Sequence, residues 1–190
     1  MNLSFIDSIF LIYMFIGLYM LSLLVLILIK SRKELFSYPK GKPEKVSIVV
    51  PCYNECGSIG KTIESLLKLE YPKNMVEIIV VDDKSTDNSA EIVKKYCEKY
   101  NNVRLIINKK NSGGAAGPTN IGIKAAKYDY IAVTDADSTP EPDALIKMIG
   151  FLQKDGKNAA VTCAVIAKNS KTFMQRLQAI EYVAIAFGRK

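Results

Sequence analysis

Two pairs of carboxylates in this 190-residue sequence are placed where they could bind a cation or a polar ligand. Asp135 and Asp137 follow the strand-like run 130–134, and alternate residues of an extended segment point to the same side. Two carboxylates on one side are typical ligands for Mg²⁺ or Mn²⁺, with water and phosphate completing the coordination. A polar turn with an Asp helix cap explains the same residues, and so short a motif leaves both interpretations open.

Asp82 and Asp83 form the second pair, directly after the apolar run 76–81. A turn and a helix cap would account for them, but adjacent like charges repel each other unless a ligand or a donor compensates. An Asp at this position could accept hydrogen bonds from a nucleobase. Asn88, followed three residues later by Glu91, predicts a capping box at the start of the next helix.

A third polar cluster, residues 51–55, closes the apolar run 46–50. Tyr53 could present an apolar face to a nucleotide and Glu55 an acceptor, whereas Glu55 could equally cap the following helix. Gly113 and Gly114 could let backbone N–H groups approach a phosphate, or they could form a mobile turn. The chain contains no His, which excludes Ser-His-Asp and Cys-His catalysis and His-ligated zinc.

Strand and helix patterns alternate around these clusters. The expected strands are 46–50, 76–81, 103–107, 130–134 and 159–167, and helical patterns lie at 59–67, 92–100, 118–126, 145–152 and 173–187. The alternation predicts an α/β domain with a mostly parallel sheet, in which ligands bind beyond the carboxyl ends of the strands. We therefore expect a site at that edge, and we expect the strands before Asp83 and Asp135 to be neighbours.

An uncharged run of 21 residues, Ile9 to Ile29, precedes this domain. As a helix it spans about 30 Å, the thickness of a bilayer core. A signal peptide would have a shorter apolar region after basic residues, and a soluble helix would have a polar face. We expect a transmembrane anchor over residues 1–29, a basic linker over residues 30–45 and a globular domain over residues 46–190.

Basic residues follow the apolar run, which predicts a single-pass protein of the cell membrane with a cytoplasmic globular domain. The formal net charge of +7 suits an anionic membrane surface or an anionic substrate. Nucleic acid is not an expected partner, because no aromatic-basic motif occurs. The four cysteines form no CxxC pair, as expected for reduced cytosolic thiols. The basic residues are Lys30, Arg32, Lys33, Lys40, Lys42 and Lys45.

Five segments in order resemble the family 2 glycosyltransferases. They are VSIVVPCYNE (46–55), IVVDDKSTD (79–87), NSGGAAGPTNIG (111–122), DADS (135–138) and QRLQAIEY (175–182). The last segment resembles the membrane polysaccharide synthases that make chitin oligosaccharides, poly-N-acetylglucosamine or hyaluronan. The resemblance implies the GT-A fold, a mostly parallel sheet flanked by helices, here preceded by one transmembrane helix.

By this resemblance the chain is a metal-dependent inverting glycosyltransferase that uses a UDP-sugar donor with Mg²⁺ or Mn²⁺. Asp83 would contact the uracil, Asp137 would bind the metal, and Asp135 would lie at the ribose and the metal. The cation would stabilise the charge that develops on the departing diphosphate. The residues that would line the nucleotide are Pro51, Tyr53 and Glu55.

The resemblance also implies that this sequence lacks the later part of the glycosyltransferase domain. In the family the acid-base carboxylate lies in a later motif, and after Asp143 this sequence has only Asp155 and Glu181 as acids. We assign no general base, and we expect the donor-binding half of a synthase, truncated at its C-terminal side, with a second chain supplying the rest. The expected acceptor is a growing polysaccharide, another glycan or a lipid-linked acceptor. Non-processive transfer to polyprenyl phosphate and nucleotide-sugar binding without catalysis are the alternatives.

Overall fold

The computed structural model describes residues 5–35, 38–39, 41–154, 156, 158–167 and 172–188. These residues divide into two units, one formed by Met1–Tyr38 with Ala164–Lys190 and the other by Pro39–Cys163. The second unit contains the sheet and the three polar clusters, so it is the unit that bears on function. Lys40 and Asp155, which the sequence analysis singled out, lie outside the described residues.

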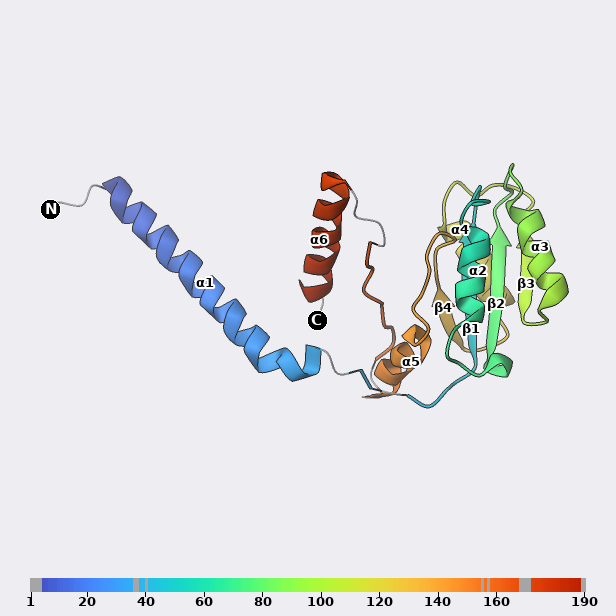
Figure 1. Ribbon diagram of the computed structural model, residues 1–190, viewed down its shortest axis with the longest axis horizontal. Helices are drawn as coiled ribbons and strands as arrows, with labels where there is room; N and C mark the ends of the chain where they lie inside the picture. The colour runs from blue at the N-terminus through green and yellow to red at the C-terminus, as the bar shows by residue number, and fades with distance from the viewer. Residues whose placement is uncertain are drawn as a thin grey trace. The chain divides into compact units, whose positions relative to one another are not determined.

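The N-terminal helix, α1 (Phe5–Leu35), is 31 residues long (Figure 1). Its segment Phe5–Ile27 has a mean hydropathy of 2.6 and is not buried by the rest of the protein. Among the described residues it is the one helix with the length and composition to cross a membrane. The helix continues through the basic residues that begin at Lys30, because Lys, Arg, Glu and Leu all favour helix.

Four parallel strands form the sheet: β1 (Val46–Cys52), β2 (Val76–Asp82), β3 (Val103–Ile107) and β4 (Tyr130–Val133). Their order is β3-β2-β1-β4. β1 and β2 are almost entirely buried, which explains their continuous runs of Val and Ile, since both faces of a parallel sheet are covered. The predicted parallel sheet is confirmed, and all four of these strands begin at the expected residue.

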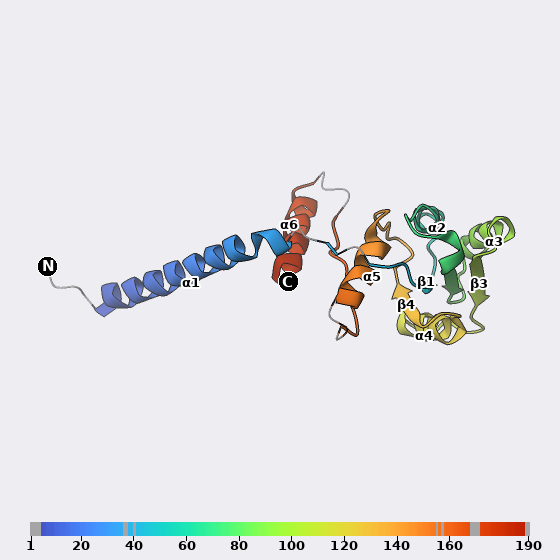
Figure 2. The ribbon, with the colours of Figure 1, turned by 90° about the horizontal axis from the view of Figure 1, so that it is seen from below.

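Helices cover both faces of this sheet (Figure 2). α2 (Ile59–Leu67) and α3 (Ser89–Lys99) lie on one face, and α4 (Ala116–Ala125) lies on the other. A short 3₁₀ helix, η1 (Lys73–Met75), leads into β2, and α5 (Ala144–Lys154) follows β4. α6 (Phe173–Gly188) belongs to the same unit as α1.

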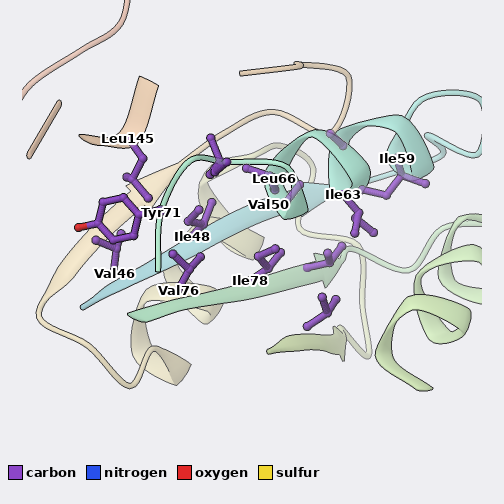
Figure 3. Packing of buried hydrophobic residues seen from close by; sticks show 14 of the residues in the cluster. Val46, Ile48, Val50, Ile59, Ile63, Leu66, Tyr71, Val76, Ile78 and Leu145 are labelled. Atoms are coloured by element: carbon purple, nitrogen blue, oxygen red, sulfur yellow. The ribbon is translucent and has the colours of Figure 1, made fainter. Parts of the chain in front are cut away.

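The larger hydrophobic core lies between the sheet and α2 (Figure 3). Alternate residues of each buried strand enter this core, as the two-residue period of a strand requires. A smaller cluster of Val49, Ile79 and Val81 lies on the opposite face, where α4 packs. The main core residues from β1, β2 and α2 are Val46, Ile48, Val50, Val76, Ile78, Val80, Ile59, Ile63 and Leu66.

Two expectations about the sheet are wrong. Residues 158–167, expected to contain a fifth strand, form none and are mostly exposed. Residues that favour strands form one only where another strand supplies hydrogen-bond partners, and no described segment pairs with this one. β2 and β4, expected to be neighbours, each pair with β1. The acidic residues after β2 and β4 therefore flank the end of β1 from its two sides.

Candidate functional site

Segments that follow β1, β2 and β4, together with residues 111–122, the Gly-rich segment, line a cavity of about 520 Å³. Ligands of open parallel sheets bind at this edge, beyond the carboxyl ends of the strands. Every residue that the sequence analysis assigned to donor or metal binding lies on the wall of the cavity. The lining residues are Pro51, Cys52, Tyr53, Glu55, Asp83, Asn111, Gly113, Gly114, Ala115, Pro118, Asp135, Ala136 and Asp137.

The loop after β1 contributes Tyr53 and Glu55 to the cavity. The Tyr53 side chain is 49% exposed, so its ring is accessible to a ligand. Glu55 lies where α2 begins: its backbone carbonyl accepts hydrogen bonds from the N–H groups of Ser58 and Ile59. The Ser58 hydroxyl also donates to the Glu55 carboxylate at 2.5 Å. Glu55 thus combines the two alternatives left open by the sequence, since it takes part in the helix start and also faces the cavity.

Hydrogen bonds fasten the loop after β1 to the loop after β2. The Asn54 N–H donates to Ser85 Oγ at 2.9 Å, and Asn54 Oδ1 accepts from the Thr86 N–H at 2.8 Å. Asn54 has a φ of 55°, a left-handed conformation that Asn tolerates better than most residues. This interloop clasp fixes the segment that carries Tyr53. Its other bonds run from Glu55 N to Ser89 Oγ (2.8 Å) and from Cys56 N to Asp87 Oδ2 (3.0 Å).

Asp87 anchors the clasp as a carboxylate. Hydrogen bonds from the Ser89 hydroxyl and from the backbone N–H groups of Ser89 and Cys56 hold the pKa of Asp87 at about 2. The predicted capping box does not form: Asn88 is the N-cap of α3, but its side chain makes no capping hydrogen bond. Asp87 accepts the hydrogen bond from the first N–H of the helix instead, because its side chain reaches Ser89 N at 3.0 Å.

Asp83, directly beyond β2, is only 2% exposed. Its Oδ1 accepts a hydrogen bond from Asn108 Nδ2 at 2.7 Å, and its Oδ2 accepts from the Ser112 N–H at 2.8 Å and the Ser112 hydroxyl at 2.7 Å. Burial raises the pKa of Asp83, but these hydrogen bonds outweigh it and hold the pKa below its usual range. Asp83 is therefore a buried, ionised acceptor at the cavity wall.

The Gly-rich segment is held against Asp83 by side-chain hydrogen bonds. Asn111 Nδ2 donates to the backbone carbonyl of Asp83 at 3.1 Å, and the Gly113 N–H donates to Asn111 Oδ1 at 2.8 Å. Gly113 has a φ of 79°, a conformation that favours glycine. A Cβ on Gly117 would collide with the Ser112 side chain, so glycine is required where α4 begins next to Ser112.

Asp135 and Asp137 lie just beyond β4, and both are exposed. Between them, Ala136 is 5% exposed, and its carbonyl accepts a hydrogen bond from Thr62 Oγ1 of α2 at 2.7 Å. The motif is thus anchored through Ala136, while both acids line the cavity. Within the described parts of the chain, neither carboxylate has a hydrogen-bond donor or a cation as partner.

These two carboxylates fit a hard divalent cation. They are oxygen ligands that no described cationic side chain neutralises, and they open onto a cavity that accepts a ligand. No group of three or more Cys, Asp or Glu side chains suited to a metal occurs among the described residues. The protein therefore offers two carboxylates and leaves the other coordination positions to water and a ligand phosphate, as is usual for Mg²⁺.

Cys52 also lines the cavity, but it is not an activated nucleophile. Burial and the neighbouring Asp82 raise the pKa of the Cys52 thiol to about 12. A thiol with so high a pKa stays protonated near neutral pH, and only the thiolate is a strong nucleophile. Cys52 is therefore not suited to form a covalent intermediate near neutral pH.

Two residues that organise the site were missed by the sequence analysis, Thr62 and Asn108. Thr62 is a polar residue on the buried stripe of α2 formed by Ile59, Ile63 and Leu66. Because a buried hydroxyl needs a hydrogen-bond partner, its position was a usable signal. Asn108 directly follows β3, at the same edge of the sheet as the acidic clusters, but its residue type alone indicates no partner.

The fold and the site define a class of protein, the glycosyltransferases of the GT-A fold. The structure of Staphylococcus aureus TarS 1–349 with UDP-GlcNAc is similar, with a TM-score of 0.55 and 29% identity. The match covers 66% of this chain and 38% of the TarS chain. The structure of mannosyltransferase PcManGT from Pyrobaculum calidifontis with GDP-Man and Mn²⁺ is also similar, with a TM-score of 0.57 and 24% identity. The match covers 80% of this chain and 45% of the PcManGT chain.

Residues 47–189 match the model of glycosyl transferase family 2, and the chain belongs to this family. The poly-β-1,6-N-acetyl-D-glucosamine synthase of Staphylococcus epidermidis is 35% identical over 160 residues, which cover 84% of this chain and 36% of the synthase. The synthase of S. aureus strain MSSA476 is 36% identical over 142 residues, which cover 75% of this chain and 34% of the synthase. The chain thus spans about a third of the length of the curated relatives it matches.

Proposed function

We propose that this chain is the donor-binding part of a membrane-anchored glycosyltransferase. It binds a UDP-sugar, whose sugar is transferred with inversion to a growing polysaccharide or another glycan. The observation that carries the proposal is that Asp83, Asp135 and Asp137 line one cavity beside the Gly-rich segment. Relatives named as poly-N-acetylglucosamine synthases support polymer formation, and the TarS structures with UDP and UDP-GlcNAc support a uridine-nucleotide donor.

The proposed donor site has a base end and a diphosphate end. Asp83, an ionised acceptor at the cavity wall, receives a hydrogen bond from the uracil. Asp135 lies at the ribose and the metal, and Asp137 is the second metal ligand. The accessible ring of Tyr53 offers an apolar surface to the nucleotide. The residues that line the nucleotide are Pro51, Tyr53 and Glu55.

Asp135 and Asp137 would hold Mg²⁺ or Mn²⁺, the cations that carboxylates and phosphates bind together. When bound, such a cation supplies positive charge that stabilises the departing diphosphate. Inversion requires the acceptor hydroxyl to attack the anomeric carbon as the bond to the diphosphate breaks, and a general base must take the hydroxyl proton. We assign that base and the acceptor contacts to sequence beyond this chain, such as a second polypeptide.

We place the globular unit on the cytoplasmic side of the cell membrane, with α1 as a single-pass anchor. The support is the length and hydropathy of α1 together with the basic residues that follow its apolar segment. A cytoplasmic site also has access to nucleotide-activated sugars, and a glycan or lipid-linked acceptor can be reached at the membrane surface.

Titration of the purified 190-residue chain with UDP tests the donor site. Binding should require Mg²⁺ or Mn²⁺, and Asp137→Ala should remove the metal dependence and weaken binding by about tenfold, the effect of losing one charged contact. Asp129→Ala removes an exposed carboxylate just before β4, at its other end, and should bind like the wild type. Equal UDP binding with and without metal, in both the wild type and Asp137→Ala, would contradict the proposal.

A further inference from the structure

The carboxylate of Asp83 has most of its acceptor positions filled by the protein. A carboxylate offers about four acceptor positions, two on each oxygen. Ser112 fills two on Oδ2, through its N–H at 2.8 Å and its hydroxyl at 2.7 Å, and Asn108 fills one on Oδ1 at 2.7 Å. No other donor among the described residues bonds to either oxygen. One acceptor position remains, on Oδ1.

A single acceptor on a buried, ionised carboxylate discriminates between ligands by the direction of their hydrogen bonds. Uracil presents an N3–H donor, whereas cytosine has a lone pair on the same ring nitrogen. An N–H placed at Oδ1 gains a hydrogen bond to a charged group, while a lone pair placed there is repelled and leaves the carboxylate unpaired. Asp83 is 2% exposed, so water cannot readily compensate for a mismatched base.

The orientation of the carboxylate decides where the remaining acceptor points. The terminal torsion of Asp has a broad energy minimum, so an isolated Asp83 carboxylate would sample many orientations. Three hydrogen bonds from two residues remove this freedom, and the donors themselves are fixed. Asn108 directly follows β3, and Ser112 is fixed by its contact with Gly117 at the start of α4.

We infer that Asn108 and Ser112 are positioning residues that determine nucleobase specificity, because they orient Asp83 so that it accepts one hydrogen bond from the imino N–H of the base. The inference rests on the proposed function, since it requires Asp83 to face the base of the bound nucleotide. It assigns to the Gly-rich segment a role at the base end of the donor, in addition to any contact that its glycines make with phosphate.

Calorimetric titration of the full chain in detergent micelles, with Mg²⁺ and either UDP or CDP, tests this inference. The wild type should bind UDP at least about tenfold more tightly than CDP, the effect of one hydrogen bond to a charged acceptor. Asn108→Ala and Ser112→Ala should bring this ratio towards one, mainly by weakening UDP binding. The control Asn101→Ala, in the exposed turn before β3, should keep the ratio.

The ratio separates specificity from a purely structural role. If both variants fold, as thermal melting shows, and lose UDP and CDP affinity by the same factor, the two residues only shape the cavity and the inference is overturned. A wild type that binds UDP with metal but does not discriminate against CDP would also overturn it, while leaving the proposed function intact. A wild type that binds neither nucleotide would overturn both.

Discussion

At the scale of single residues, Glu77 joins the strands at the edge opposite the cavity. It lies in β2, is 3% exposed, and accepts hydrogen bonds from the Ser47 hydroxyl at 2.9 Å and from the Lys127 N–H at 3.1 Å. The Arg104 guanidinium forms an ion pair with it at 2.5 Å. Burial raises the pKa of Glu77, but the bonds from Arg104, Lys127 and Ser47 outweigh burial and lower it. Glu77 thus links β1, β2, β3 and the turn before β4.

Glu77→Gln should therefore lower the free energy of unfolding by about 1–3 kcal/mol near neutral pH, because a charged acceptor is lost from a buried network. Since the pKa of Glu77 is lower in the folded chain, its contribution is present above the unfolded pKa, about 4.3, and is lost as the pH falls through the folded value. Urea denaturation of wild type and variant should differ at about pH 7, and the difference should disappear as the pH falls through the lowered folded pKa of Glu77. Glu98→Gln, on an exposed position of α3, should change little, and equal stability of Glu77→Gln and wild type at neutral pH would contradict this role.

The acidic residues of the site could be predicted from the sequence, but their supports could not. Asp83 follows the buried strand β2 and Asp135 lies just beyond the mostly exposed strand β4, and all strands of a parallel sheet end at one edge. The hydrogen bonds that orient them depend on tertiary packing: Thr62 reaches Ala136 from α2, and Asn108, just beyond β3, reaches Asp83. No local pattern encodes contacts between residues so far apart in the chain.

At the scale of elements, two helical glycines have opposite surroundings. A Cβ on Gly122 of α4 would collide with the side chain of Val49 in β1. A Cβ on Gly60 of α2 would have the Tyr96 hydroxyl as its nearest neighbour, at 3.5 Å, which is an ordinary contact. Replacing a helical glycine by alanine gains about 0.5–1 kcal/mol, whereas overpacking a buried contact costs about 1–3 kcal/mol. The collision therefore makes Gly122→Ala destabilising, whereas the gain in helix propensity makes Gly60→Ala stabilising.

Gly60→Ala should raise the free energy of unfolding by about 0.5–1 kcal/mol, and Gly122→Ala should lower it by about 1–2 kcal/mol. Each variant serves as the control for the other, because the chemical change is the same and only the surroundings differ. Urea denaturation measures both. A more stable Gly122→Ala would show that α4 can move away from β1 at little cost, and would contradict the close packing described for this helix.

Apolar runs predicted strands correctly where a partner strand is present, which includes the buried β1 and β2 and the mostly exposed β4. β1 and β2 are covered on both faces, and their Val and Ile runs predicted their positions. Residues 159–167 have a similar composition but lie mostly exposed, with Val165 63% and Ile166 77% exposed. Strand formation in that segment depends on a partner strand, which composition does not specify.

At the scale of the whole molecule, the position of α1 relative to the charges predicts which side of the membrane the cavity faces. In intact cells, a membrane-impermeant maleimide should label Ser37→Cys only after permeabilisation. Ser37 lies outside the described residues, so its position in the sequence alone motivates the choice. The wild type gives the background of the four native cysteines. Labelling of Ser37→Cys in intact cells would place the globular unit outside.

The cavity also predicts that this chain alone binds a donor without normal transfer. Its described lining contains four carboxylates, those of Glu55, Asp83, Asp135 and Asp137. In the proposed function Asp83 contacts the uracil, and Asp135 and Asp137 hold the ribose and the metal. Glu55 is hydrogen-bonded to Ser58 at the start of α2. None of them remains as the general base that takes the acceptor proton, a role that contributes about 10²–10⁴-fold to the rate.

We therefore expect metal-dependent UDP binding and at most slow hydrolysis of UDP-GlcNAc by the 190-residue chain, measured as UDP release. Addition of a polypeptide that supplies a base and acceptor contacts should restore transfer, because positioning of the acceptor contributes separately from proton removal. Asp137→Ala, which lacks a metal ligand, should not be restored by the same addition. Glu181, an exposed acid on α6, is the one late carboxylate among the described residues. Robust polymer synthesis by this chain alone, lost in Glu181→Gln, would show that the base is already present and that this glutamate provides it.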